Sequence, residues 1–168
     1  ALVGFLLFFR LDTIPHGLTN DEVSEGYNAF SILKTGADRY GMFYPILFRS
    51  FGTYLLPLYT YLTAMAFLIF GVSAVGVRLV SVASGLIVIF LTFLIFKDEE
   101  KKKPLVFSLA VVFLLSFSPW LIFFSRSSTE VTLSLALFLS GIYFLMQSLK
   151  KPVNFVAGCL MLGLSSWA

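Results

Sequence analysis

Long apolar runs separated by short polar segments dominate the pattern of this chain. Three of them, residues 74–96, 104–124 and 131–149, reach the length of a membrane span and are bounded by charged or polar residues. A transmembrane helix needs about 20 consecutive apolar residues, so each run predicts one span. The apolar ends 1–9 and 153–168 are shorter. We expect them to be the outer end of a first span and part of an interrupted last span.

Between the first and second spans lies a loop, residues 10–73, with helical signals of its own. Thr19 followed three residues later by Glu22 is a capping-box pattern, and apolar positions then repeat at helical spacing before Gly36 closes the run. We therefore predict an amphipathic helix lying at the membrane surface.

The second half of this loop, residues 53–70, is interpreted as another surface helix rather than a span. It contains three tyrosines and Pro57, a mixture that suits the headgroup zone, and it is short for a crossing. This choice matters because a full span here would place the preceding polar loop in the cytoplasm. An interfacial helix leaves that loop outside the membrane.

Composition and charge support a membrane protein. Hydrophobic residues make up 58% of the chain and charged residues only 12%, too little polar surface for a water-soluble globule, so we predict an all-α, multi-pass fold. The basic residues gather in short runs at 97–103 and 150–151, which the positive-inside rule places in the cytoplasm. They form no stripe interleaved with aromatic residues, which argues against nucleic acid. One cysteine and one histidine indicate no metal centre.

Carboxylates cluster in the first turn of the predicted surface helix. Asp21 and Glu22 lie at its amino end, and Glu25 follows Asp21 by four residues, which puts like charges on one face. Acids in a first turn commonly stabilise the helix, and that is the simpler interpretation. A carboxylate beside a second acid at the rim of a membrane also suits a general base. We favour Asp21 as the base and give Glu22 an orienting role within the catalytic pair.

Several short motifs occur in an order that resembles a known family. They are Asn20-Asp-Glu-Val-Ser-Glu-Gly-Tyr27, Thr35-Gly36, Tyr40-Gly41, Phe48-Arg-Ser-Phe-Gly52, Pro57-Leu-Tyr59, Phe70-Gly-Val72, Val77-Arg-Leu79, Ser118-Pro-Trp120, Phe124-Ser-Arg126 and Glu130. Together they resemble the amino-terminal part of GT-C fold membrane glycosyltransferases. More narrowly, they resemble bacterial and archaeal members of glycosyltransferase family 39, which are related to the protein O-mannosyltransferases and the lipid A aminoarabinose transferase.

This resemblance implies a function and a place for it. Such enzymes are multi-pass proteins of the plasma membrane that transfer a sugar from a polyprenyl-phosphate donor to an acceptor hydroxyl on a protein, lipid or polysaccharide. The transfer takes place on the extracytoplasmic side, with the first acid of the Asp-Glu pair essential, here Asp21. It needs no cofactor beyond the lipid-linked donor, and no divalent metal is indicated.

The resemblance also names further site residues. It maps a second outer acid onto Glu130 and adds Tyr59 of the Pro57-Leu-Tyr59 motif. Relatives commonly carry a lysine where this chain has Leu55, so another cation must meet the donor phosphate, because positive groups stabilise a departing phosphate. The candidates are Arg49, Arg78 and Arg126.

Each of these arginines also has a simpler explanation. Arg78 and Arg126 could reach the headgroups from a membrane boundary, and Arg49 could be a solvated loop residue. Arg126 and Glu130, four residues apart, could form a surface ion pair if they share a helix.

Two other classes of protein are kept as alternatives. One is a transporter or flippase for lipid-linked sugars, which handles the same lipids without chemistry. Transporters usually carry ionisable groups near the membrane midplane, whereas the predicted spans here are almost free of charge. The other is an inactive paralogue that binds the donor without transfer, an alternative that the missing lysine supports.

Overall fold

The computed structural model describes residues 2–99 and 105–168, and the chain in these ranges is mainly helical. The helices are α1 (Leu2–Phe8), α2 (Asn20–Thr35), α3 (Pro57–Phe70), α4 (Ala74–Glu99), α5 (Leu105–Ser116), α6 (Pro119–Arg126), α7 (Glu130–Ser148) and α8 (Val153–Ser165). Two short strands, β1 (Phe48–Ser50) and β2 (Thr53–Leu55), lie between α2 and α3. Residues 100–103 of the predicted basic turn fall outside the described residues.

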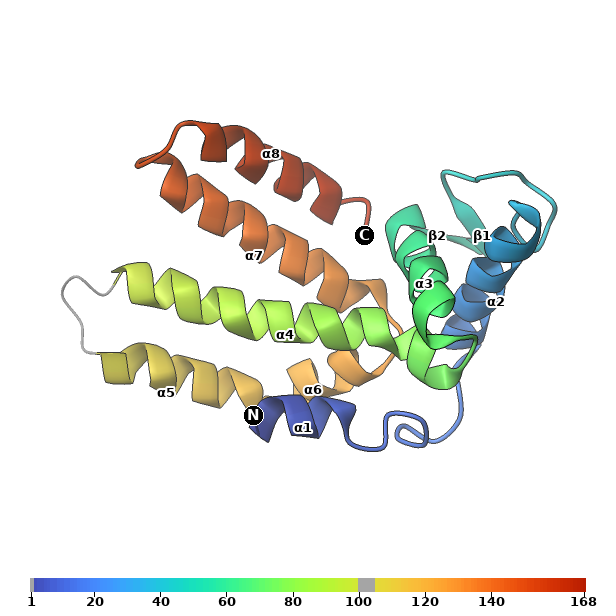
Figure 1. Ribbon diagram of the computed structural model, residues 1–168, viewed down its shortest axis with the longest axis horizontal. Coiled ribbons are helices and arrows are strands. Elements are labelled where there is room, and N and C mark those ends of the chain that lie inside the picture. Colours follow the sequence, from blue (N-terminus) through green and yellow to red (C-terminus); the bar gives the residue numbers. More distant parts are fainter. Residues whose placement is uncertain (1, 100–104) are drawn as a thin grey trace.

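The elements form two groups (Figure 1). The long helices α4, α5, α7 and α8 run side by side along the longest axis of the molecule, with α1 and α6 below α4 in this view. Helices α2 and α3 and the two strands gather at one end of the long helices and run across their direction. The polar loop of the sequence is therefore a small helical layer on one end of a helical bundle.

Two of the predicted membrane spans are confirmed as single helices of sufficient length. Residues 74–97 of α4 and all of α7 are long and apolar enough to cross a membrane, and they match the predicted spans at 74–96 and 131–149. Both end-segment predictions, 1–9 and 153–168, correspond to short helices, α1 and α8. The structure thus supports a membrane protein.

The predicted span at 104–124 is found as two helices rather than one. Helices α5 and α6 occupy this stretch and are bent by 58° at the break between them. Pro119 is the first residue of α6, and a proline disfavours helical backbone in the residue before it and donates no N–H to the preceding turn. Taken together, α5 and α6 pass as one broken span.

Helix α2 begins and ends where the sequence predicts. The Glu22 N–H donates to Thr19 Oγ1 at 3.2 Å, and the Glu22 carboxylate accepts from the Thr19 N–H at 2.8 Å, which is the reciprocal capping box. Gly36 ends the helix with a left-handed φ of 72°, a conformation that glycine adopts without strain. Local sequence signals alone therefore set both termini of this helix.

The segment 53–70 contains a strand and a helix. Helix α3 covers 14 residues, too few to cross a bilayer unaided, so its length agrees with a surface helix. The preceding β1–β2 hairpin corrects the all-α prediction. Its two-residue turn, Phe51-Gly52, has both φ angles positive, at 42° and 88°, as tight hairpin turns require.

Small buried clusters attach the end layer to the bundle. Ala29 of α2, Phe67 of α3 and Val77 of α4 pack together, and Tyr59 of α3 packs against Leu133 of α7. Helix α2 approaches α4 closely at Gly26, where an added Cβ would lie 2.9 Å from a methyl group of Val77. This packing fixes the first turn of α2 over the ends of α4 and α7.

Candidate functional site

The strongest polar contact of the end layer joins α2 to α4. The Nε of Arg78 donates to Glu22 Oε1 at 2.8 Å and its Nη2 donates to Glu22 Oε2 at 3.2 Å. Neither side chain is exposed to solvent, because the exposed fractions are 0% and 1%. A planar guanidinium meets a carboxylate in this two-bond manner with good geometry, so the pair holds α2 in a defined place.

All five N–H groups of Arg78 are used inside the protein. Besides the two bonds to Glu22, Nη1 donates to the carbonyl oxygens of Leu11 and Pro15, and Nη2 donates to that of Gly17 at 2.6 Å. A guanidinium has five donors, and none remains for a ligand. In this structure the guanidinium of Arg78 therefore serves the scaffold, and its predicted contact with a donor phosphate stays a prediction that would require one of these bonds to break.

The Glu22 carboxylate is equally occupied. It also accepts from the backbone N–H of Ser128, at 3.0 Å, in the turn between α6 and α7. Burial acts to raise the pKa of Glu22, but the hydrogen bonds from Arg78, Thr19 and Ser128 and the positive charge of Arg78 outweigh it, so the pKa lies below its ordinary value. Glu22 is therefore a fixed anion that joins three parts of the chain, and its geometry fits the orienting role.

A second buried carboxylate lies one turn further along α2. Glu25 is 4% exposed and accepts a hydrogen bond of 2.6 Å from the hydroxyl of Thr60, a fully buried residue of α3. Burial is the largest cause that raises the pKa of Glu25, and the charges of Glu130 and Asp21 act in the same direction. The Thr60 bond opposes them, and the pKa is about 7. This carboxyl can exchange a proton near neutral pH.

These interactions place three acids together, which we call the outer acid group: Asp21, Glu25 and Glu130. Asp21 is exposed at the amino end of α2, and Glu130 is the first residue of α7. Glu130 accepts a hydrogen bond of 3.4 Å from the N–H of Leu56, the residue before α3. The group therefore contains one exposed, one partly buried and one buried carboxyl from two helices. Its hydrogen-bond donors come from Thr60 in α3 and from Leu56, the residue before α3.

A cavity opens beside the outer acid group. It has a volume of about 430 Å³ and is lined by Glu130, Ser134 and apolar residues of α7, together with Ser165 and Ala168 at the end of α8. A mainly apolar groove of about 370 Å³ lies along α2, between Val23, Tyr27, Phe67 and the start of α4. The first cavity is thus reached from Glu130, and the apolar groove follows α2 itself.

Arg126 has a different set of partners from those that the sequence suggested. Its Nη1 donates to the carbonyl oxygens of Leu6 and Leu7, and its Nη2 donates to those of Phe9 and Ile14. Leu6 and Leu7 belong to the last turn of α1, where carbonyls lack helical partners, so Arg126 caps that helix.

The expected pairing of Arg126 with Glu130 is therefore wrong. The two residues lie on separate helices, α6 and α7, and the ion pair found among residues 2–99 and 105–168 is the one between Glu22 and Arg78. Because the terminal nitrogens of Arg126 are occupied by carbonyl oxygens, a bond from them to a donor phosphate requires α1 to lose its cap.

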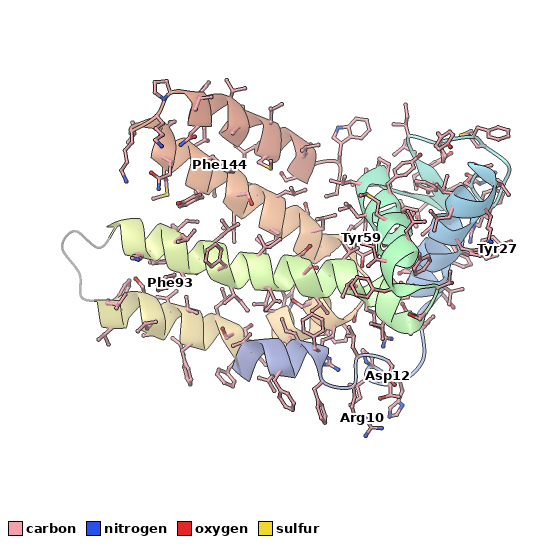
Figure 2. All side chains as sticks on the ribbon, in the orientation of Figure 1. Arg10, Asp12, Tyr27, Tyr59, Phe93 and Phe144 are labelled. Atoms are coloured by element: carbon pink, nitrogen blue, oxygen red, sulfur yellow. The ribbon has the colours of Figure 1, made fainter. Side chains whose placement is uncertain are left out.

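Arg49 lies apart from the outer acid group, whereas Tyr59 is buried near Glu25, whose charge adds to burial in raising the tyrosine pKa. Arg49 is exposed on β1, whereas its neighbour Ser50 faces α2 and shares a hydrogen bond of 2.8 Å with Ser24. Adjacent residues of a strand point to opposite faces, so Arg49 points away from α2. Tyr59 is buried between α3 and α4 (Figure 2), and its hydroxyl donates to the Val77 carbonyl and bonds to Ser81 Oγ. Its pKa is raised by burial.

Sequence reasoning missed Glu25 and Thr60 as site residues. The four-residue spacing from Asp21 to Glu25 was a signal, since a like-charge pair on one helix face is unfavourable unless something else keeps it. Thr60 gave no comparable signal, because its partner is 35 residues away. Among the residues that the structure describes, no group of three His, Cys, Asp or Glu side chains is placed to hold a metal ion.

Comparisons with protein-family models, curated proteins and solved structures found no match for this chain.

Proposed function

We propose that this chain is part of a membrane glycosyltransferase of the GT-C, family 39-like type. It would transfer a sugar from a polyprenyl-phosphate donor to an acceptor hydroxyl on the extracytoplasmic side. The observation that carries the proposal is the different environment of two neighbouring acids on α2. Glu22 is locked by Arg78, whereas its neighbour Asp21 is exposed beside Glu25 and Glu130.

Asp21 has the position that a general base needs. It lies at the exposed amino end of a helix whose orientation is fixed by a buried ion pair, so its carboxylate is presented at a constant place. Glu25 and Glu130 lie close enough to Asp21 for its charge to act on both of them, so an acceptor at Asp21 would meet a group of three carboxyls. The cavity of about 430 Å³ that Glu130 lines offers room for an acceptor.

The proposed reaction is a direct displacement. The Asp21 carboxylate takes the proton of the acceptor hydroxyl, and that oxygen attacks the anomeric carbon of the sugar. The bond from this carbon to the phosphate oxygen breaks, its electron pair leaves with the polyprenyl phosphate, and the configuration at the anomeric carbon inverts. The apolar groove beside Val23 and Tyr27 suits part of an isoprenoid chain.

A second candidate function is an inactive relative that binds the donor without transfer. It is favoured by one specific observation, namely that Arg78 and Arg126 are both used by the scaffold. Leu55 also stands where relatives carry a lysine. None of these three positions therefore offers a cation to the donor phosphate. The two candidate functions differ in whether the sugar leaves its polyprenyl-phosphate carrier.

The test is sugar transfer by the full-length protein in membranes, with a panel of radiolabelled polyprenyl-phosphate sugars. Release of sugar to an acceptor or to water supports the transferase, and donor binding without release supports the inactive relative. Asp21→Asn should lower turnover by about 10²- to 10⁴-fold, the usual contribution of a general base. Asp12→Asn is the matched control, because Asp12 is an exposed aspartate that precedes α2.

A further inference from the structure

The loop that joins α2 to α3 carries an exposed aromatic and basic surface that the proposed transfer does not use. We call the exposed side chains of residues 40–54, together with the half-buried Arg39, the loop patch. It contains Arg39 and Arg49, and its large exposed hydrophobic side chains are Tyr40, Met42, Phe43, Tyr44, Ile46, Leu47, Phe51 and Tyr54. Contiguous apolar surface of this kind marks a contact with a membrane or another molecule.

The two arginines are organised by aromatic rings. The guanidinium of Arg39 lies 4.9 Å from the centre of the Tyr40 ring and 5.2 Å from that of Phe51, and the guanidinium of Arg49 lies 5.5 Å from the Tyr40 ring. The Nη2 of Arg39 also donates to the Tyr40 hydroxyl at 3.1 Å and its Nε is buried, so this guanidinium has little conformational freedom, whereas Arg49 is exposed. The patch thus presents two positive charges beside aromatic rings.

The hairpin turns this surface away from the rest of the end layer. On β1, Phe48 and Ser50 are buried, with Ser50 bonded to Ser24 of α2. Arg49 and its cross-strand partner Tyr54 lie on the opposite face of the hairpin, and both are exposed. The inward face therefore holds the loop on α2, and the outward face remains free of the described chain.

The positive charge of the patch is not neutralised within it. Asp38 is the one acidic residue in the segment 37–56, and its carboxylate is buried. It accepts hydrogen bonds of 2.9 Å from the N–H groups of Tyr40 and Met42, so it serves to shape the loop. An anionic partner is the chemical complement of what remains exposed.

The position of the loop indicates which kind of anionic partner the patch contacts. Tyr44 and Ile46 share a cavity of about 270 Å³ with Leu164 and Trp167 at the end of α8. Helix α8 packs along α7, which is long enough to span a membrane, and Figure 1 shows the hairpin at this same end of the bundle. The loop patch therefore lies close to the level at which the apolar helices end, where the headgroups of a bilayer are found.

We propose that the loop patch is a membrane-docking surface for anionic glycerophospholipids. The aromatic side chains enter the headgroup layer, and Arg39 and Arg49 donate to lipid phosphates. Aromatic residues with one polar edge and arginines are the types that favour this layer, and anionic lipids attract basic groups next to the membrane. The proposal assigns Arg49 to bulk lipid rather than to the sugar donor, and it does not depend on the proposed transferase activity.

The test uses the full-length protein in nanodiscs with a tryptophan reporter in the patch. All tryptophans of the full-length protein, Trp120 and Trp167 among them, are first replaced by Phe, and Phe43→Trp or Phe51→Trp is then introduced. Quenching is measured with a nitroxide-headgroup lipid and with aqueous iodide, in phosphatidylcholine with and without phosphatidylglycerol. We expect strong quenching by the lipid nitroxide, weak quenching by iodide, and closer lipid contact when phosphatidylglycerol is present.

Paired variants separate charge from folding. Arg39→Gln with Arg49→Gln should abolish the response to phosphatidylglycerol, whereas Arg39→Lys with Arg49→Lys should retain most of it. Arg10→Gln is the control, because Arg10 is an exposed arginine outside the patch. Efficient iodide quenching, which puts the patch in water, overturns the proposal. Absence of quenching by both agents also overturns the proposal, because it shows that another part of the protein or a partner covers the patch.

Discussion

The guanidinium of Arg78 holds the carboxylate of Glu22 at 2.8 Å, with neither side chain in contact with solvent. This pair joins α4 to the first turn of α2 and also binds the segment that precedes α2, through the carbonyls of Leu11, Pro15 and Gly17. The acidic first turn of α2 therefore contains a structural anion next to an exposed one, Asp21.

Removal of one partner of the Glu22–Arg78 pair should destabilise the protein strongly. Glu22→Gln and Arg78→Gln each leave a buried charge without its partner, which costs about 3–5 kcal/mol. The double variant should cost clearly less than the sum of the two. Thermal unfolding in detergent measures all three, with Lys151→Gln as an exposed control. Additive losses would show that the pair is not an energetic unit.

Glu25 should make the stability of the protein fall as the pH rises from about 4.5 to about 7. The lower value is the pKa of this carboxyl in the unfolded chain, and the higher value is its pKa in the folded protein. In this window the folded carboxyl holds a proton that the unfolded chain has released, so a higher pH favours unfolding. The full loss is about 3 kcal/mol. Glu25→Gln should remove it and be more stable than the natural chain above pH 7, as unfolding at a series of pH values will show.

The pKa of Glu22 is shifted the other way, which gives this experiment an internal reference. Because its folded pKa lies below the ordinary value of 4.5, its stabilisation is present above that pH and is lost as the pH falls through the folded pKa. The loss of stability at acid pH that comes from Glu22 should persist in the Glu25→Gln variant. A Glu25→Gln variant whose stability still falls between pH 4.5 and 7 would contradict the assignment of that window to Glu25.

Arg126 should be needed for the attachment of α1. It donates to four carbonyl oxygens at the end of α1 and in the loop beyond it, and a lysine cannot reproduce this forked arrangement. We expect Arg126→Lys to be almost as destabilising as Arg126→Gln and to increase amide hydrogen exchange in residues 2–14. Arg10→Gln should leave exchange unchanged. Full rescue by lysine would mean that charge alone matters.

The side of the membrane on which α2 lies can be measured directly. In a cysteine-free background that includes Cys159→Ser, Asn20→Cys places a thiol beside Asp21, and Lys151→Cys places one just beyond the opposite end of α7. An impermeant maleimide added to intact cells should label residue 20 and spare residue 151. Labelling of residue 151 in its place would reverse the proposed topology.

Local sequence signals predicted one part of the structure and missed another for physical reasons. The capping box at Thr19 and Glu22 and the glycine at Gly36 act over a few residues, so both ends of α2 could be predicted. In the same way, the length of the apolar runs was sufficient to predict helices α4 and α7. The break before Pro119 carried a local signal, a proline inside an apolar run, which hydropathy alone overlooks.

The candidate site depended on contacts that a single sequence does not display. Arg78 meets Glu22 across 56 residues, and Arg126 meets the end of α1 across more than 100. A pattern of residue types shows that charges lie near a membrane boundary, but tertiary packing decides which of them are paired. The sequence therefore marked Asp21 and Glu22 as a pair with different roles, and the packing shows what holds Glu22 in place.

The division of roles between Asp21 and Glu22 is tested most directly by measuring unfolding and sugar transfer on the same preparations of two full-length variants. We expect Asp21→Asn to keep the natural unfolding temperature and to lose transfer by about 10²- to 10⁴-fold. Glu22→Gln should lose stability first, and its remaining folded fraction should retain part of its activity. Normal transfer by a folded Asp21→Asn variant would contradict the account.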